Sequence, residues 1–390
     1  MQFRWLTSLN SIPAGAWDAL FEPTELFAKH AFLLALEQGG SVDGNSGWFS
    51  RHASLWQDDQ LIAVIPGYLK THSYGEYLFD WPMVRAYEHY QLPYYPKWIS
   101  AIPFTPVTGS RLAVLPCLDW QSIASLLIQT VLADIAQQGW HSAHWFYCHL
   151  PLQQLLLDQQ CLPRHEVQFL WQNQQYTDFS DFLAALSSRK RKQIRQERKK
   201  TQQLPLQFKT LQGIDITPAQ WQSVIACYQQ TYQERSGHNG YISAESWWQL
   251  LSSMRAQIVV FAAFTQDDPA QLVAAALCFQ LGDTLYGRYW GALADYALLH
   301  FECCYYQGIQ YCIEHGLRYF DGGAQGEQKL RRGFSPVLRY GACWYRPNIL
   351  SSAIEQYCQK EQQHCQHMLA AASELLPYSQ ANSLAAFSGK

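Results

Sequence analysis

The clearest pattern of hydrophobic and polar positions lies in residues 285–334. Residues 285–290 have the aromatic, alternating character of a strand. Between residues 301 and 313, apolar or small side chains recur at helical spacing, and Gly316 is placed to end that helix as a left-handed cap. A short strand is predicted over residues 317–321. The order strand, helix, strand is therefore predicted for a segment that is crowded with polar and ionisable groups.

A similar pattern occurs earlier in the chain. Residues 48–70 and 258–281 each predict a hairpin with a Gln-Asp-Asp turn, followed by a Tyr-Gly-x-Tyr segment at 74–77 and 286–289. An extended conformation is predicted over 73–81. Two interpretations stay open, namely two copies of one domain or a chance similarity between two hairpins.

The main cluster of charge is a basic run over residues 189–200, in which eight of twelve residues are Lys or Arg. As a helix, this run places Arg191, Arg195 and Arg198 on one face, with Ile194 almost its only apolar member. The face is either simply solvated or binds a polyanion, such as a pyrophosphate, a nucleotide-linked substrate or an RNA backbone, which would relieve the repulsion between like charges.

Composition bounds the domain organisation. A chain of 390 residues, 48% apolar and 15% charged, exceeds one ordinary core. Two domains are predicted, over residues 1–165 and 166–375, with a flexible tail over 376–390. The net charge of −3 argues against affinity of the whole protein for DNA or an anionic membrane.

Cysteine usage and hydropathy bear on the compartment. The eleven cysteines are odd in number and form no C-x-x-C pair, which favours reduced, buried thiols over disulfides or a metal site. Neither a signal-peptide pattern nor an apolar run of membrane-spanning length is found. A soluble, cytoplasmic protein without an integral membrane segment is expected.

The order of elements resembles the GNAT acyltransferase core, and the chain looks like a member of the FemAB-like group, predicted N-acyltransferases with tandem GNAT domains. The segments that carry the resemblance are 68–81, 93–109, 182–200, 285–291, 300–309 and 323–334. The resemblance implies an α+β fold of two GNAT-like domains, each with a splayed mixed sheet. Fem enzymes transfer an amino acid from aminoacyl-tRNA to a cell-wall precursor, and ordinary GNAT proteins use acyl-CoA. The GNAT pyrophosphate loop is replaced here by ALADYALL, residues 292–299.

Acylation of an amine needs a base, donors for the oxyanion and a proton for the leaving group. Glu302 and Glu327 are the candidate bases, although Glu302 is equally suited to a helix N-terminus and Glu327 to a surface ion pair. Tyr286 and Tyr289 are candidate proton donors. The candidate substrate-binding residues are Arg288, His300, Gln325, Lys329, Arg332, Arg191, Arg195 and Arg198, together with His72, Glu76 and Asp80 of the first copy. His300 also suits a structural role.

These observations predict an N-acyltransferase that moves an acyl or aminoacyl group to an amine, with a cell-wall precursor or another small molecule as acceptor. Acyl-CoA or aminoacyl-tRNA is the co-substrate, so tRNA is a candidate partner, and no tightly bound cofactor or metal is expected. The alternative is a non-catalytic module that recognises a peptidoglycan or nucleotide-linked ligand.

Overall fold

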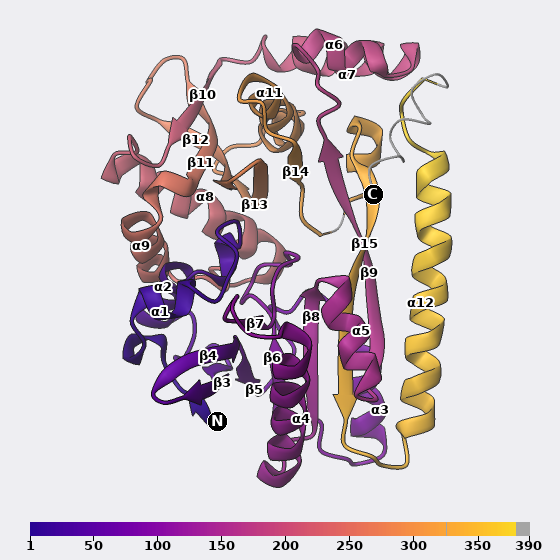
Figure 1. Ribbon diagram of the computed structural model, residues 1–390. Coiled ribbons are helices and arrows are strands. Elements are labelled where there is room, and N and C mark those ends of the chain that lie inside the picture. The colour runs from indigo at the N-terminus through magenta and orange to yellow at the C-terminus, as the bar shows by residue number, and fades with distance from the viewer. Residues whose placement is uncertain (325, 380–390) are drawn as a thin grey trace. The chain divides into compact units, whose positions relative to one another are not determined.

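The computed structural model describes residues 1–324 and 326–379, which form two compact units. Both units are discontinuous in sequence (Figure 1). The first unit comprises Met1–Glu166, Tyr241–Ser253 and Leu338–His367, and the second comprises Val167–Gly240, Met254–Val337 and the chain from Met368 onward.

The first unit begins with short strands and helices and then alternates longer ones. Its elements are β1 (Gln2–Leu6), η1 (Leu9–Ser11), α1 (Ala14–Asp18), η2 (Leu26–Ala28), α2 (His30–Gln38), β2 (Trp48–Ser50), β3 (His52–Gln57), β4 (Gln60–Ile65), β5 (Tyr68–Lys70), α3 (Trp81–His89), β6 (Lys97–Ser100), β7 (Ala113–Val114), α4 (Trp120–Gln138), β8 (Ser142–Cys148), α5 (Leu150–Asp158), α9 (Ala244–Ser253), most of β15 (Ser335–Tyr345) and most of α12 (Ser351–Glu374).

Two groups of strands form in the first unit. One is an antiparallel sheet of order β1-β3-β4-β7. The other runs β15-β8-β6-β5-β2, in which β6 and β8 are parallel and the remaining pairs are antiparallel. Helix α4 supplies the crossover between β6 and β8, and Asp119 caps its start by accepting from the backbone N–H of Ser122 at 2.9 Å. Gly139, at φ 77°, ends α4 in the left-handed conformation.

The second unit contains residues 285–334. Its elements are β9 (Leu162–Gln172), α6 (Phe179–Ala185), α7 (Ser188–Thr201), β10 (Leu206–Gln212), α8 (Pro218–Ser236), η3 (Arg255–Gln257), β11 (Ile258–Thr265), β12 (Leu272–Leu281), β13 (Thr284–Ala292), α10 (Leu299–Phe301), the π-helical turn η4 (Glu302–Tyr306), α11 (Gln307–Glu314), β14 (Tyr319–Asp321) and η5 (Glu327–Arg332).

Strands of the second unit follow the order β10-β11-β12-β13-β14-β9. The pairs are antiparallel except for β13 and β14, which are parallel and joined by α10, η4 and α11 as one continuous crossover helix. A parallel pair requires such a crossover. The strand–helix–strand order predicted for residues 285–321 is therefore observed, and Gly316 adopts φ 65° after α11.

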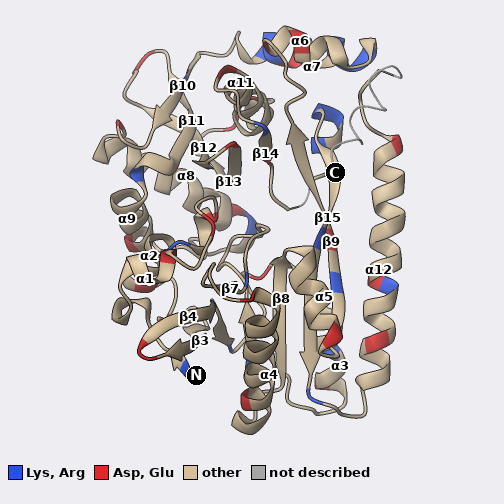
Figure 2. Cartoon of the chain, in the orientation of Figure 1, with Lys and Arg blue, Asp and Glu red and all other residues tan. Residues whose placement is uncertain are grey.

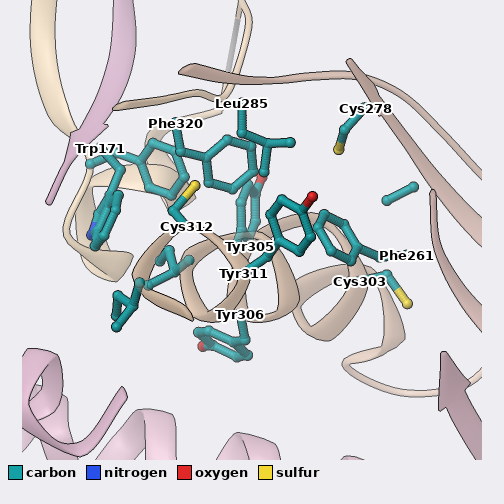
Figure 3. Packing of buried hydrophobic residues seen from close by; sticks show 14 of the residues in the cluster. Trp171, Phe261, Cys278, Leu285, Cys303, Tyr305, Tyr306, Tyr311, Cys312 and Phe320 are labelled. Carbon is teal, nitrogen blue, oxygen red and sulfur yellow. The ribbon is translucent and has the colours of Figure 1, made fainter. Parts of the chain in front are cut away.

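The crossover helix provides the core of the second unit. Tyr305 and Cys312 project from it into a cluster of apolar side chains from the sheet (Figure 3), and Ile309 of the same helix belongs to this cluster. Leu285 of β13 and Phe320 of β14 belong to the same cluster, and all five side chains are buried. Burial of this apolar face is the main term that holds the helix on the diverging strands.

One local prediction in the first unit is wrong, and one predicted hairpin pairs differently from its counterpart. Residues 73–80 form no strand, and Trp81 already begins helix α3. The hairpin β3–β4 belongs to the four-stranded sheet, whereas the corresponding β11–β12 hairpin pairs directly with β13. Similar sequence patterns therefore lead to different strand pairing in the two units.

The cysteines are all free thiols, and Cys117 alone among the eleven is exposed. Burial raises the pKa of Cys148 and of Cys161 to about 12. These thiols are therefore protonated and shielded from solvent, which makes them unreactive.

Part of the predicted tail lies outside the described residues, namely 380–390. The preceding residues contact the second unit, because Pro377 O accepts from the backbone N–H of Ser187 at 2.8 Å. Tyr378 donates its hydroxyl to Gly333 O at 2.6 Å.

Helix α8 packs on β13 at backbone distance, and Gly291 makes this possible. A Cβ on Gly291 would lie 1.7 Å from the carbonyl oxygen of Cys227. We expect Gly291→Ala to lower the free energy of unfolding by at least about 3 kcal/mol, measured by urea denaturation.

The matched control is Gly15→Ala, because Gly15 lies in α1 with no atom within 4 Å of a Cβ. This variant should gain about 0.5–1 kcal/mol from improved helix propensity. Equal stability of the two variants would contradict the close packing of α8.

Candidate functional site

The two parallel strands of the second unit separate after a short pairing. Thr284–Tyr286 pairs with Tyr319–Asp321, and β14 then ends whereas β13 continues to Ala292. We call the region between the diverging ends the fork. In open α/β sheets, ligands bind beyond the carboxyl ends of parallel strands, so the fork is the candidate site.

A β-bulge lies in β13 at the fork. Leu277 pairs with Tyr289 and Cys278 pairs with Gly287, so the extra residue of β13 is Arg288. A bulge redirects the side chain of the extra residue. Here the Nη1 of Arg288 donates to Asp321 Oδ1 at 3.0 Å, and the Arg288 side chain is only 1% exposed. Arg288, predicted to bind an anionic substrate, thus forms a buried ion pair across the fork.

The glycine-rich turn after β14 is held from both sides. The backbone N–H of Gly323 donates to Asp321 Oδ1 at 2.9 Å, with Gly323 at φ 74°. Lys329 is buried, and its Nζ donates to Gly323 O at 3.0 Å and to Ala324 O at 3.1 Å. Lys329 therefore shapes the turn from within the protein. Gln325, also predicted to bind substrate, lies outside the described residues.

Glu302 lies in the π-helical turn η4 and is 3% exposed. Its carboxylate accepts from Arg198 Nη2 at 2.9 Å, from Thr201 Oγ1 at 3.2 Å and from Gln307 Nε2 at 2.7 Å. Both oxygens are thus engaged by donors. This arrangement fixes α7 against the crossover helix, and π-helical turns of this kind often occur at functional sites.

A second ion pair of opposite direction lies beside the first. Arg332, 2% exposed, donates to Glu197 Oε2 on α7 at 2.9 Å and to the Tyr306 hydroxyl at 3.0 Å. Tyr306 also donates to Glu197, and the guanidinium stacks 3.5 Å from the centre of the Phe301 ring. Two ion pairs, each with one buried partner, therefore join helix α7 to η5 and to the crossover helix.

These contacts separate the three arginines that the sequence groups on one face of α7. Arg191 donates to the carbonyl oxygens of Ala184 and Leu186 at 3.2 and 3.1 Å. Arg198 is paired with Glu302, and Arg195 is exposed. The helix consequently does not present the three arginines together to a ligand.

The remaining predicted residues of the second unit differ in accessibility. Glu327 is exposed at the start of η5, immediately after the glycine turn. Tyr289 is buried, with its ring 5.4 Å from that of Tyr228. Tyr286 is partly exposed, with the Arg288 guanidinium 5.3 Å from its ring centre. One tyrosine of the pair is therefore buried, and the other remains partly accessible.

His300 packs between aromatic rings, 5.4 Å from Trp290 and 5.3 Å from Tyr305. Burial, reinforced by the positive charges of Arg235, Arg332 and Lys329, lowers the pKa of His300 to about 4. The imidazole is therefore neutral at physiological pH.

The first unit contains a buried cluster of four charged side chains. Strand pairing places Lys70 opposite Lys97, and both lysines are 0% exposed. Lys97 Nζ lies 2.5 Å from Asp80 Oδ2 and 2.8 Å from Glu76 Oε2. Lys70 Nζ lies 3.7 Å from Glu76 Oε1, 3.0 Å from Tyr74 O and 3.9 Å from the centre of the Trp48 ring.

The two lysines of the cluster differ in how strongly the neighbouring carboxylates stabilise their charge. Burial opposes ionisation of Asp80, but Lys97 outweighs it and holds the pKa of Asp80 well below its usual range. Burial lowers the pKa of Lys70 to about 7, although Glu76 acts in the opposite direction. Lys97 is thus the firmly held cation and Lys70 the weakly held one.

Sequence reasoning selected Glu76 and Asp80 but missed both lysines. Lys97 is the only charged residue between His89 and Arg111, and a single charge in an apolar stretch is a signal of a buried partner. His72, also selected, is half-buried; burial lowers its pKa, and its Nδ1 accepts from the backbone N–H of Tyr74 at 3.2 Å.

In the first unit, the segment that follows strand β6 of the parallel pair is itself buried. Beyond the pairing of Ser100 with Trp145, residues 101–107 are all buried. Arg111, 1% exposed, donates to Phe146 O at 2.9 Å and to Val107 O. The corresponding loop of the second unit, residues 293–298, contains no fully buried residue. The second unit therefore has the more accessible fork.

Comparison with known protein families gives a match over nearly the whole chain. The FemAB-like family, described as peptidoglycan biosynthesis/recognition, matches residues 8–380. The chain belongs to the FemAB-like family. A comparison of its sequence with curated proteins gives no match.

Solved structures share the fold of this FemAB-like protein at low sequence identity. L-PGS from Bacillus licheniformis has a TM-score of 0.50 at 11% identity, over 83% of this chain and 90% of that chain. The C-terminal domain of a putative lysylphosphatidylglycerol synthetase from Agrobacterium fabrum has a TM-score of 0.50 at 12% identity, over 88% of this chain and 94% of that chain. FemX has a TM-score of 0.48 at 10% identity, over 91% of this chain and 100% of that chain. The predicted α+β, tandem GNAT-like class is confirmed at the level of the fold.

Residues 1–324 and 326–379 contain neither a metal-binding cluster nor a membrane-spanning helix. No group of three His, Cys, Asp or Glu side chains in this part of the FemAB-like chain has metal-binding geometry. Within the same residues, no helix is long and apolar enough to span a membrane.

The depressed pKa of His300 gives stability a defined pH dependence. Below pH 6.5, His300 is protonated in the unfolded chain, whereas in the folded protein it stays neutral until about pH 4. We expect wild type to lose stability relative to His300→Phe as the pH falls from 6.5 to 4, by at most about 1.4 kcal/mol per pH unit. Urea denaturation at several pH values measures this difference. With His89→Phe, an exposed control on α3, the same comparison should give a smaller slope, and equal slopes would contradict the assignment.

The unequal roles of the two buried lysines are also testable. Lys97→Met leaves Asp80 without its close cation and should cost about 3–5 kcal/mol of unfolding free energy. Lys70→Met should cost less at pH 7. Wild type should gain stability relative to Lys70→Met as the pH rises from 7 towards 10, because the unfolded chain then retains a proton that folded Lys70 has released. Equal losses at pH 7, or a flat difference above it, would contradict this account.

Proposed function

We propose that this FemAB-like protein is a transferase that moves an acyl or aminoacyl group onto an amine of a cell-wall or lipid precursor. The observation that carries the proposal is the fork of the second unit, with its bulge at Arg288, its Arg288–Asp321 bridge and its glycine turn. The family description, peptidoglycan biosynthesis/recognition, supports this class of acceptor.

The chemistry requires few groups. The acceptor amine attacks the carbonyl carbon of an activated ester or thioester, a C–N bond forms, and the alcohol or thiol of the donor departs with a proton. Charge develops on the carbonyl oxygen, and preorganised N–H donors stabilise it. We assign this role to the edge of β13 that diverges from β14, because the bulge and the buried ion pair hold that edge rigid.

Among the predicted bases, we favour Glu327. It is exposed beside the glycine turn, whereas the carboxylate of Glu302 is saturated by Arg198, Thr201 and Gln307. We therefore assign Glu302 to holding α7 in place. Tyr286, which is partly exposed at the end of the strand pairing, is the candidate donor to the leaving group.

The donor belongs to the activated esters and thioesters, with aminoacyl-tRNA and acyl-CoA as its two candidate members. The loop of residues 293–298 contains no glycine, so a glycine-rich pyrophosphate loop cannot form there. This observation favours a donor other than acyl-CoA.

A second candidate function, ligand recognition without turnover, is favoured by one observation. The buried candidate carboxylate of the crossover helix, Glu302, is engaged in an ion pair and so offers no unoccupied oxygen to an amine. In this alternative the fork binds a peptidoglycan fragment, and Glu327 is an ordinary surface residue.

The test begins with donors and ends with variants. Thermal shifts with acetyl-CoA, a longer acyl-CoA and a charged tRNA identify a donor, and transfer of its labelled group to a UDP-linked muropeptide measures activity. Asp321→Asn breaks the bridge to Arg288 and should lower kcat/KM about 100-fold, because misplacement of the fork by about 1 Å has that effect. Glu327→Gln should lower kcat by about 100-fold or more.

Asp267→Asn is the matched control, since Asp267 is exposed in the β11–β12 turn of the same unit. Its transfer rate should equal that of wild type. Unchanged activity of Glu327→Gln would remove this residue from the mechanism. Stabilisation by a donor together with an absence of transfer would favour the recognition function.

A further inference from the structure

Helix α7 carries a row of exposed cations, which we call the basic stripe: Arg189, Lys192, Arg195, Lys199 and Lys200. Spacings of three and four residues place Arg189, Lys192, Arg195 and Lys199 along one side of the helix, and Lys200 lies at the edge of that side, beside Lys199. Figure 2 shows Lys and Arg at both ends of α7. The stripe extends over about 17 Å, given a rise of about 1.5 Å per residue.

The stripe is not neutralised by its own helix. The only acidic residue of α7, Glu197, faces inward and pairs with Arg332. The Arg198–Glu302 pair holds the same inner face. Because each ion pair has a buried partner outside α7, rotation of α7 would leave a buried charge unpaired, and like charges four residues apart repel each other. A fixed row of uncompensated positive charge fits an anionic partner.

The shape and composition of the stripe indicate which polyanion fits. Besides the cations, the exposed residues of α7 are Ser188 and Gln196, so no aromatic ring is present to stack a base, as single-stranded nucleic acid sites require. The major groove of A-form RNA is too narrow to admit a helix. A straight, convex row of cations instead matches a flat surface.

We propose that the basic stripe docks this protein on anionic phospholipid headgroups at a bilayer surface. Each Lys or Arg close to such a surface strengthens binding about fivefold, and the attraction is lost within a Debye length. Five cations without an inserted apolar side chain give reversible association that depends on salt. The docking surface is polar throughout, and it lies entirely on α7.

The benefit of docking rests on the proposed function, whereas the docking itself does not. An acceptor carried by a lipid is confined to the bilayer, and an enzyme held there meets it at a raised effective concentration. Membrane binding is measured without any donor or acceptor, so inactivity in the transfer assay would leave this test intact.

The experiment measures partitioning of the full chain onto vesicles of phosphatidylcholine with 30% phosphatidylglycerol, by co-sedimentation at low and high salt. Wild type should bind these vesicles but not pure phosphatidylcholine. The variant Lys192→Gln, Lys199→Gln, Lys200→Gln should bind about 100-fold more weakly, at about fivefold per cation. Its thermal midpoint should equal that of wild type, because these side chains are exposed.

The control variant Arg85→Gln, Arg255→Gln, Lys360→Gln removes the same charge from exposed positions outside α7 and should bind nearly as well as wild type. Equal weakening in both variants would mean that net charge rather than the stripe is responsible, and would overturn the proposal. Absence of binding by wild type at low salt would also overturn it.

A parallel titration with deacylated tRNA tests the competing partner. If the stripe variant loses affinity for tRNA and keeps its affinity for vesicles, the stripe is an RNA-binding surface and the membrane proposal is wrong. Loss of vesicle binding with unchanged tRNA affinity supports the proposal.

Discussion

The structure of the second unit depends on the separation of two parallel strands. Strand β13 is bonded to β12 along its length, whereas its pairing with β14 ends at Tyr286 and Asp321. Backbone groups that leave a ladder must find other partners or a ligand. The Arg288–Asp321 ion pair, Lys329 and the glycine turn all lie at this point. The chemistry of the candidate site is therefore a consequence of strand divergence rather than of one special residue.

Electrostatics holds the neighbouring elements in place by pairs rather than by net charge. Two ion pairs of opposite direction, Arg198–Glu302 and Glu197–Arg332, join α7 to its surroundings in the second unit. In the first unit, Lys97 is paired with Asp80 and Glu76, and all three side chains are buried. Buried pairs add little stability compared with apolar packing, but they define a single arrangement of the groups that form them. Both clusters therefore favour geometric precision over stability.

Much of the secondary structure could be predicted because apolar periodicity reports burial directly. The pattern over 301–313 predicts the crossover helix, and glycines mark its end and that of α4. The bulge at Arg288 could not be predicted, since it depends on the register with β12. The same limit applies to α7: periodicity places Arg198 on a face with Arg195, but the buried carboxylate of Glu302, about a hundred residues away in sequence, determines that Arg198 is turned inward. Contacts between residues that are distant in sequence therefore could not be predicted.

The distribution of thiols has a practical consequence. Cys117 is exposed just before α4, whereas burial keeps thiols such as Cys148 protonated and inaccessible. A maleimide dye should therefore react at one position of the unmodified protein. A fluorophore placed there would report on the first unit without any engineered cysteine, so that ligand binding and vesicle association could be followed on the natural sequence.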